Sequence, residues 1–188
     1  MKSRHECMLY GGSPDRHLSA IAAVIREKLD KRHRCMYFNS PEMVGNLRWK
    51  LKTLEVDVQR ELEAGRLVLT SERAHLRDGQ FDMDLMLRML EEVFYKAMNE
   101  GYAGLWTSGD MGWEFGPSQD FSKLREYELK LDEFFEAHPE YGGVCQYYGP
   151  NLPNLAIQDA FHTHPMIFVT DSLSMSNTRY RDSKFVHA

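Results

Sequence analysis

The stretch Cys7-Met8-Leu9-Tyr10-Gly11-Gly12-Ser13-Pro14-Asp15 predicts a strand, then a turn, then the start of a helix. The apolar run predicts a strand over residues 7–10 that stops at the two glycines. Ser13 is predicted to be the N-cap of a helix, with Pro14 in its first turn, where a missing N–H costs nothing. The helix is expected to bury an apolar stripe of Leu18, Ile21, Ala22, Ile25 and Leu29.

The same alternation of apolar runs and amphipathic segments continues along the chain. Further strands are predicted at residues 35–38, 67–69, 104–107, 144–147 and 166–169. Helices are predicted at residues 41–54, 58–64, 81–99, 121–138 and 155–161. Strands that are apolar throughout and alternate with helices are typical of a mostly parallel sheet covered on both faces. The predicted fold class is therefore α/β, with three layers.

The length and composition indicate one soluble globular domain. The 188 residues leave little room for a second domain, and 43% of them are hydrophobic and 27% charged. We expect the α/β domain to span residues 1–170. Residues 171–188 are polar, and we expect them to form a tail that is either disordered or docked on a partner.

Charge and hydropathy restrict the partners and the location. The net charge is −5, and the basic residues are spread among acidic ones, which argues against direct contact with nucleic acid. No apolar stretch approaches the roughly 18 residues of a membrane span, and the N-terminus has no signal-peptide core. Cys7, Cys35 and Cys145 form no CxxC pair. Free thiols in the cytoplasm are therefore expected, with no contact to a membrane.

The carboxyl ends of the predicted strands are the expected ligand site, because open parallel sheets bind ligands there. All six ends are polar or rich in glycine: 11–13, 39–40, 70–72, 108–110, 147–148 and 170–171. Polar loops are also expected of any soluble protein. A ligand crevice is predicted to be lined by Tyr10, Gly11, Gly12, Ser13, Ser40, Asp110, Trp113 and Tyr147.

The first of these loops lacks the chemistry of a phosphate-binding loop. Such a loop needs a lysine followed by serine or threonine, and backbone N–H groups that surround the phosphates. Residues 11–16 contain no lysine, Asp15 lies where phosphate would sit, and Pro14 removes an N–H donor. ATP hydrolysis of the Walker type is therefore excluded.

Several other residues allow a chemical and a structural interpretation. Asp110 could hold a metal ion or cap a turn, and Trp113 could be a core anchor or the wall of a ligand pocket. His162-Thr163-His164 has a spacing that can bind zinc, but Pro165 follows and no third ligand is evident. Cys145 could be a nucleophile or a small buried hydrophobe. We expect the structural role for the histidines and Cys145, and predict no metal, no cofactor and no catalytic residue.

An ordered set of short motifs resembles the MEDS family, sensory domains of methanogen and methylotroph regulators that include a dichloromethane-responsive repressor. The resemblance covers roughly residues 5 to 169. It rests on 5–10, 35–38, 65–67, 81–82, 101–102 with 104–105, 110–113, 127–128, 145–147 and 164–165. It implies a RecA-like domain without the phosphate loop, attached to histidine kinases or to transcription or sigma-factor regulators. No kinase or DNA-binding segment is recognised here, so either a separate partner carries the output or the chain is a piece of a longer protein.

Three functions remain open. The preferred one is a non-catalytic sensory domain that binds a small organic molecule and signals to a regulatory protein. The second is a protein–protein interaction module without a ligand, for which a homodimer is one form. The third is an enzyme, either a nucleotide hydrolase that uses Asp110 and Glu72 with a metal ion, or a thiol-dependent enzyme that uses Cys145.

Overall fold

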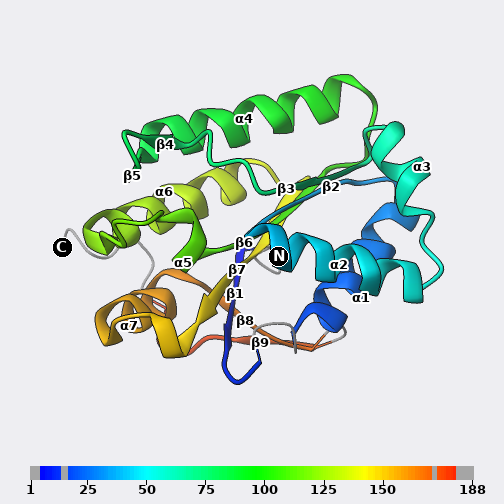
Figure 1. The fold of residues 1–188 in the computed structure, drawn as a ribbon. Helices are drawn as coiled ribbons and strands as arrows, with labels where there is room; N and C mark the ends of the chain where they lie inside the picture. Colours follow the sequence, from blue (N-terminus) through cyan, green and yellow to red (C-terminus); the bar gives the residue numbers. More distant parts are fainter. Residues whose placement is uncertain (1–4, 14–16, 171–172, 181–188) are drawn as a thin grey trace.

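The computed structural model describes residues 5–13, 17–170 and 173–180, which fold around one seven-stranded sheet (Figure 1). The strand order is β3-β2-β6-β7-β1-β8-β9, and all neighbours are parallel except β8 and β9. The strands are β1 (His5–Tyr10), β2 (Arg34–Phe38), β3 (Leu67–Thr70), β6 (Leu105–Asp110), β7 (Tyr141–Tyr148), β8 (Met166–Thr170) and β9 (Leu173–Ser176). A separate hairpin joins β4 (Leu76–Arg77) to β5 (Gln80–Phe81).

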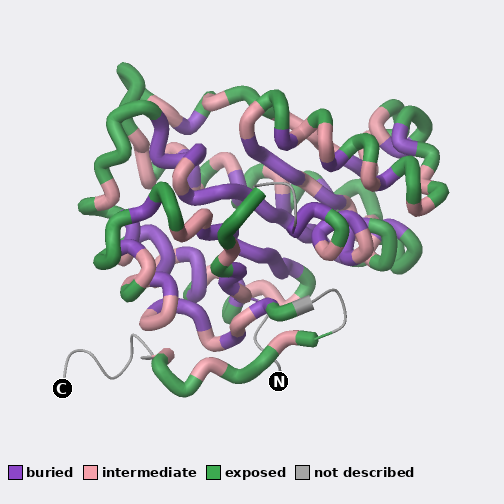
Figure 2. The backbone as a smooth tube through the Cα atoms, turned by 60° about the horizontal axis from the view of Figure 1, so that its bottom comes forward, coloured by how far each residue is buried: buried purple, intermediate pink, exposed green. Residues whose placement is uncertain are grey.

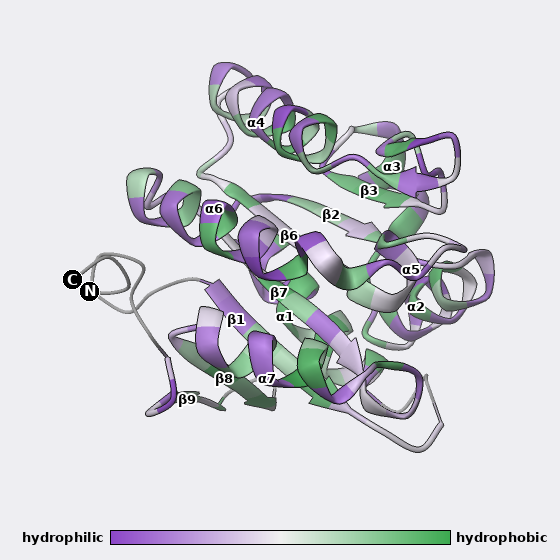
Figure 3. Cartoon of the chain, turned by 90° about the vertical axis from the view of Figure 1, so that its left-hand side faces the viewer, coloured by the Kyte–Doolittle hydropathy of each residue, from purple (hydrophilic) through white to green (hydrophobic). Residues whose placement is uncertain are grey.

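Helices cover both faces of the sheet, which confirms the predicted three-layer α/β fold (Figures 1 and 3). One face carries α1 (Leu18–Asp30), α2 (Pro41–Thr53) and α3 (Val58–Glu63). The other carries α4 (Met83–Asn99), α5 (Met111–Glu114), α6 (Leu124–Ala137) and α7 (Asn154–Thr163). Two short 3-10 helices, Phe121–Lys123 and Gly149–Asn151, precede α6 and α7. None of the helices in the described ranges is long and apolar enough to cross a membrane.

The strands at the centre of the sheet separate two hydrophobic cores. Figure 2 shows that buried residues are concentrated in the interior of the fold. Successive side chains of a strand point to opposite faces, so β1, β2, β6, β7 and β8 each contribute to both cores. On β7, Val144 packs in the core under α1 and α2, and Cys145 packs in the core under α4 and α6. This alternation determines which side chains can meet at a site.

The first helix begins later than predicted. Its first residue is Leu18, and His17 stands at the N-cap without a side-chain cap, so Ser13 is not the N-cap. Pro14 lies outside the described residues. The ring of His17 lies 3.7 Å from that of Tyr10, centroid to centroid. Because this contact holds the His17 ring beside the end of β1, α1 begins only after His17.

The fourth helix also begins later, at Met83, because Asp82 is its N-cap. The carboxylate of Asp82 accepts a hydrogen bond of 2.9 Å from the N–H of Leu85. Phe81, predicted to be the first helical residue, belongs to β5 and stacks on Phe115 at 4.1 Å between ring centroids. The hairpin fixes Phe81 in extended backbone, which explains the difference.

The sheet extends beyond residue 170, where the sequence placed the end of the domain. Residues 173–176 form β9, antiparallel to β8, and Asn177 donates hydrogen bonds to the carbonyls of Phe161 and His164. The prediction of a tail that is disordered or docked on a partner is therefore wrong for residues 173–180, which pack on their own domain. Residues 171–172 and 181–188 lie outside the described part.

Candidate functional site

Six polar side chains meet where three adjacent strands of the sheet, β6, β7 and β1, end. We call them the strand-end cluster: Tyr10, His17, Ser108, Asp110, Gln146 and Tyr148. The parallel register places Asp110 beside Gln146 and Tyr10 beside Tyr148. The Tyr10 hydroxyl reaches across β7 and donates a hydrogen bond of 2.9 Å to Asp110 Oδ2. Two strands that are not neighbours are thereby joined at this end of the sheet.

A second chain of hydrogen bonds orders the rest of the cluster. His17 Nε2 donates to the side-chain oxygen of Gln146 at 2.6 Å, and Gln146 donates to Ser108 Oγ at 2.7 Å. Ser108 in turn donates to the backbone carbonyl of Val144. This order of donors assigns a proton to Nε2 of His17 and fixes the orientation of the Gln146 amide.

The Tyr10 ring lies beside two other aromatic rings, one of which, that of Tyr148, also contacts the exposed glycine loop. Its centroid is 3.7 Å from that of His17 and 5.1 Å from that of Tyr148. The Tyr148 hydroxyl donates to the backbone carbonyl of Gly12 at 2.9 Å. The cluster therefore combines a half-buried aromatic surface with a loop, residues 11–13, that solvent reaches.

Asp110 is buried, and burial raises the pKa of its carboxyl group although Tyr10 and backbone N–H groups donate to it. One of those donors is the N–H of Trp113, so Asp110 also caps α5. The described members of the cluster include neither lysine nor arginine. Its donors, acceptors and rings suit an uncharged small molecule and provide no counter-charge for a triphosphate.

The side chains of three other predicted ligand residues, Ser40, Trp113 and Tyr147, do not join this cluster. Ser40 caps α2 by accepting from the N–H of Met43. Trp113 is only 7% exposed and packs under the guanidinium of Arg73, which agrees with a core anchor. Tyr147 does not join Tyr10 and Asp110. Its side chain lies on the opposite face of the sheet, because it follows Gln146 directly on β7.

A second polar group is buried on that opposite face, under α6 and α7. We call it the buried cluster: His5, Glu128, Cys145 and His164. The ligand atoms of the four residues all lie within 4.8 Å of one another. Burial and the charge of Glu128 raise the pKa of Cys145 well above its usual value. A buried thiol of this kind is not an activated nucleophile.

The histidine pair 162–164 does not lie on a strand, as a shared zinc site would require. It ends α7, where His162 is half-exposed and His164 is buried. The partners of His164 are Glu128, from α6, and His5, from β1. Glu128 and His5 lie far from His164 in the sequence, which explains why the sequence alone shows no third ligand.

The sequence held a signal for some of the residues that were missed. Glu128 falls on the apolar stripe of its helix, between Leu124 and Leu131, where a carboxylate needs a partner. Gln146 likewise interrupts a strand that is otherwise apolar or aromatic. Nothing in the sequence brings His5 or His17 to these positions, because their contacts are distant along the chain.

A cavity of about 10 Å³ lies between the sheet and α6, with Glu114, Thr107 and Cys145 in its lining. This volume is at the lower limit for holding one water molecule, so no organic ligand fits there. Both carboxylate oxygens of Glu114 lack a hydrogen-bond partner among the described residues. Burial raises the pKa of Glu114 well above its usual value.

Comparisons with known proteins agree on the fold and on one family. The family model of the methanogen/methylotroph, DcmR sensory (MEDS) domain matches residues 4–165. The transcriptional repressor DcmR of Methylorubrum extorquens is 25% identical over 160 residues, which are 85% of this chain and 57% of the repressor. The chain thus spans little more than half the length of this curated relative.

Three solved structures share the architecture at low sequence identity. The KaiC-like protein PH0186 of Pyrococcus horikoshii has a TM-score of 0.58 at 15% identity, and the match covers 88% of this chain and 70% of that one. Protein PH0321 of the same organism, in complex with an unknown peptide, has a TM-score of 0.65 at 13% identity, and the match covers 89% of this chain and 77% of that one. The flagellar accessory protein FlaH of Methanocaldococcus jannaschii has a TM-score of 0.62 at 12% identity, and the match covers 96% of this chain and 83% of that one. The likeness confirms the RecA-like fold class and carries no activity across.

Proposed function

The chain belongs to the MEDS family of sensory domains, and from this premise we propose that it binds a small organic molecule at the strand-end cluster and signals without catalysis. The family and the similarity to the DcmR repressor support a sensory or regulatory role. The proposed recipient of the signal is a regulatory protein, such as a histidine kinase or a transcription or sigma-factor regulator.

The observation that carries this proposal is the hydrogen bond between Tyr10 and Asp110 at the carboxyl ends of β1 and β6. It brings a phenol, a carboxyl group and three aromatic rings to the edge where parallel sheets bind ligands. A small uncharged molecule with one polar group could exchange hydrogen bonds with Tyr10 and Asp110 and rest its apolar part on the rings.

The same contacts suggest how binding would be transmitted. Tyr148 ties the loop at Gly12 to the end of β7, and α1 is the next helix along the chain. A ligand shifts such an arrangement only if it binds one loop position more tightly than another. Movement of α1 relative to β7 is therefore the expected signal to a partner.

The absence of catalysis is part of the proposal and has its own test. Cys145 is buried with a raised pKa, and Glu72 is exposed on the loop after β3, which is two strands away from β6. The expected result is no ATP hydrolysis above background with Mg²⁺ or Mn²⁺. Metal-dependent hydrolysis that Asp110→Asn abolishes would contradict the proposal.

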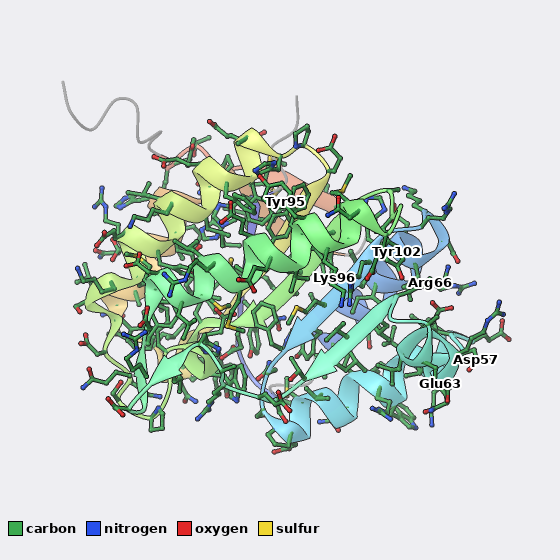
Figure 4. The ribbon with its side chains drawn as sticks, turned by 90° about the horizontal axis from the view of Figure 1, so that it is seen from above. Asp57, Glu63, Arg66, Tyr95, Lys96 and Tyr102 are labelled. Atoms are coloured by element: carbon green, nitrogen blue, oxygen red, sulfur yellow. The ribbon has the colours of Figure 1, made fainter. Side chains whose placement is uncertain are left out.

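Ligand binding is tested by thermal shift with small alcohols, ketones, haloalkanes and nucleotides. A ligand at 100 times its Kd stabilises the folded chain by about 2.7 kcal/mol, a shift that melting curves resolve. Tyr10→Phe and Asp110→Asn should abolish the shift. Tyr95→Phe, on the outer side of α4, is the matched control and should keep it (Figure 4). A shift that survives both site variants would place the ligand elsewhere.

Protein–protein interaction alone is a second candidate, favoured by apolar side chains at one edge of the sheet. Val169, Leu173 and Met175 are 47%, 50% and 55% exposed, and β9 pairs only with β8 among the described strands. An apolar edge strand is suited to pairing with a second copy. This candidate predicts a dimer by light scattering that Met175→Lys makes monomeric, and a monomeric wild-type chain would reject it.

A further inference from the structure

The buried cluster has the composition and shape of a metal site. His5 comes from β1, Glu128 from α6, Cys145 from β7 and His164 from the end of α7, and each is fully or almost fully buried. Imidazole, thiolate and carboxylate are the ligands that zinc takes in proteins. We infer that these four side chains bind one tetrahedral divalent ion of the zinc class, inside the domain and on the opposite face of the sheet from the strand-end cluster.

The distances between the ligand atoms match the edges of a zinc tetrahedron. Zn–S bonds of about 2.3 Å and Zn–N or Zn–O bonds of about 2.0–2.1 Å give edges of about 3.3–3.4 Å between N and O, and about 3.6 Å from sulfur. Glu128 Oε2 lies 3.2 Å from His5 Nε2 and 3.4 Å from His164 Nε2. Cys145 Sγ lies 3.7 Å from His5 Nε2 and 3.6 Å from Glu128 Oε2.

His164 presents a bare nitrogen to the centre of this group. Its Nδ1 donates to the backbone carbonyl of Ala160 at 2.9 Å, which places the ring proton on Nδ1. In this neutral tautomer Nε2 carries a lone pair, and it has no hydrogen-bond partner in the described part of the chain. A lone pair that faces the Glu128 carboxylate is repulsive, and a cation between them turns both into ligands.

The surroundings orient the other ligands in the way that metal sites require. His5 Nδ1 bonds to Asp132 Oδ1 at 3.1 Å, which directs Nε2 inward. Glu128 Oε1 accepts a hydrogen bond from the Tyr147 hydroxyl, which leaves Oε2 for the ion. Metal-bound histidines characteristically donate their second N–H to a carboxylate or a carbonyl, and both partners are present here.

A hydrogen-bond network without metal is the alternative explanation of the buried cluster, and it leaves His164 unexplained. Hydrogen bonds to Asp132 and Glu128 outweigh burial and raise the pKa of His5, so a protonated His5 could bridge the two carboxylates. That bridge gives no role to the bare nitrogen of His164. A divalent ion engages it, and the thiolate and carboxylate of Cys145 and Glu128 neutralise its two charges. On binding, the Cys145 thiol proton and the Nε2 proton of His5 leave to solvent.

Burial also determines how the ion would enter. The four ligand residues are shielded from water, so the ion would be taken up as the chain folds and exchange slowly afterwards. The test therefore unfolds the 188-residue chain in denaturant with a chelator and refolds it with Zn²⁺, with Co²⁺ or without metal. Metal content is measured per chain, and the cobalt form is examined for a thiolate charge-transfer band and tetrahedral visible bands.

The expected result is one ion per chain with a thiolate band, and a melting temperature that falls when metal is omitted. Cys145→Ser should remove the thiolate band, and His164→Gln should weaken binding at least tenfold. Cys35→Ser, a buried cysteine on the other face of the sheet, is the matched control and should retain ion and band.

Two results would overturn the inference: wild-type chain that refolds without retaining zinc or cobalt, or a thiolate band that persists in Cys145→Ser. If Cys145→Ser fails to refold, the wild-type cobalt spectrum decides. Cys7 and Cys35 lie outside the cluster, so a tetrahedral thiolate spectrum of Cys35→Ser supports the site and its absence rejects it.

Discussion

The hydroxyl of Tyr10 and the carboxylate of Asp110 are joined by a hydrogen bond of 2.9 Å, although they belong to strands separated by β7. A tyrosine side chain is long enough to span the intervening strand, and Gln146 of that strand lies alongside. The bond ties the end of β1, and with it the glycine loop, to the start of α5.

Tyr10→Phe should lower the free energy of unfolding by about 1–3 kcal/mol, because the buried Asp110 carboxyl loses a donor. Urea denaturation measures this change. Tyr148→Phe is the comparison, since its hydroxyl bonds to the exposed loop carbonyl of Gly12, and its loss should be smaller. Equal losses of unfolding free energy in the two variants would show that the Tyr10–Asp110 bond stabilises the fold no more than the exposed bond of Tyr148 does.

Glu114 should make the domain less stable as the pH rises. Burial raises its pKa in the folded chain, so above the unfolded pKa the unfolded chain holds fewer protons than the folded one. The free energy of unfolding then falls with rising pH, by up to about 1.4 kcal/mol per pH unit for one group. Glu114→Gln should flatten this dependence and raise stability at pH 7–8 relative to the wild type.

Urea denaturation at pH 5, 6, 7 and 8 tests the Glu114 prediction. Glu133→Gln, on the exposed side of α6, removes the same charge without burial and should leave the pH profile parallel to that of the wild type. If Glu114→Gln also gives a parallel profile, the buried carboxyl does not control the pH dependence.

Gly109 should not tolerate a side chain. A Cβ atom there would lie 1.9 Å from a Glu114 carboxylate oxygen and 2.3 Å from the Phe38 ring. Gly109→Ala should therefore cost about 1–3 kcal/mol of unfolding free energy through overpacking. Gly45→Ala is the matched variant in the middle of α2, with no atom within 4 Å of the new Cβ. It should gain up to about 1 kcal/mol from helix propensity, and a similar loss at both positions would contradict the packing argument.

Asp82→Ala should cost about 1 kcal/mol by removing the N-cap of the longest helix. Asp84→Ala takes an equal charge from the first turn of the same helix and removes no cap, so its effect should be a few tenths of that. Chemical denaturation of both variants measures the difference. Equal effects would mean that charge, and not capping, stabilises this helix end.

The sequence predicted the sheet and the layers because apolar runs and helical stripes are local signals. The six parallel strands were all predicted within a few residues of their observed bounds. The antiparallel strand β9 was not predicted, because Ser174 and Ser176 give this single edge strand the polar composition of a tail. The late start of α1 was missed because it depends on the contact between Tyr10 and His17, which only the folded chain makes.

The candidate sites were predictable in part. The carboxyl ends of the strands were expected to gather polar residues, and Tyr10 and Asp110 do meet there. Tyr147 was expected to line the same crevice, but its side chain faces the opposite side of the sheet, because successive residues of a strand alternate between the two faces. The approach of His5 to Glu128 and Cys145 could not be foreseen, since it joins residues more than a hundred positions apart in the chain.

Cys145, Gln146 and Tyr147 are consecutive, and they face alternately the buried cluster and the strand-end cluster. Three peptide units of one central strand are thus common to both proposed sites. If an ion on one face altered the affinity for a molecule on the other, the molecule would alter the ion's affinity by the same factor. Metal supply could then set the threshold concentration at which this domain responds to its effector.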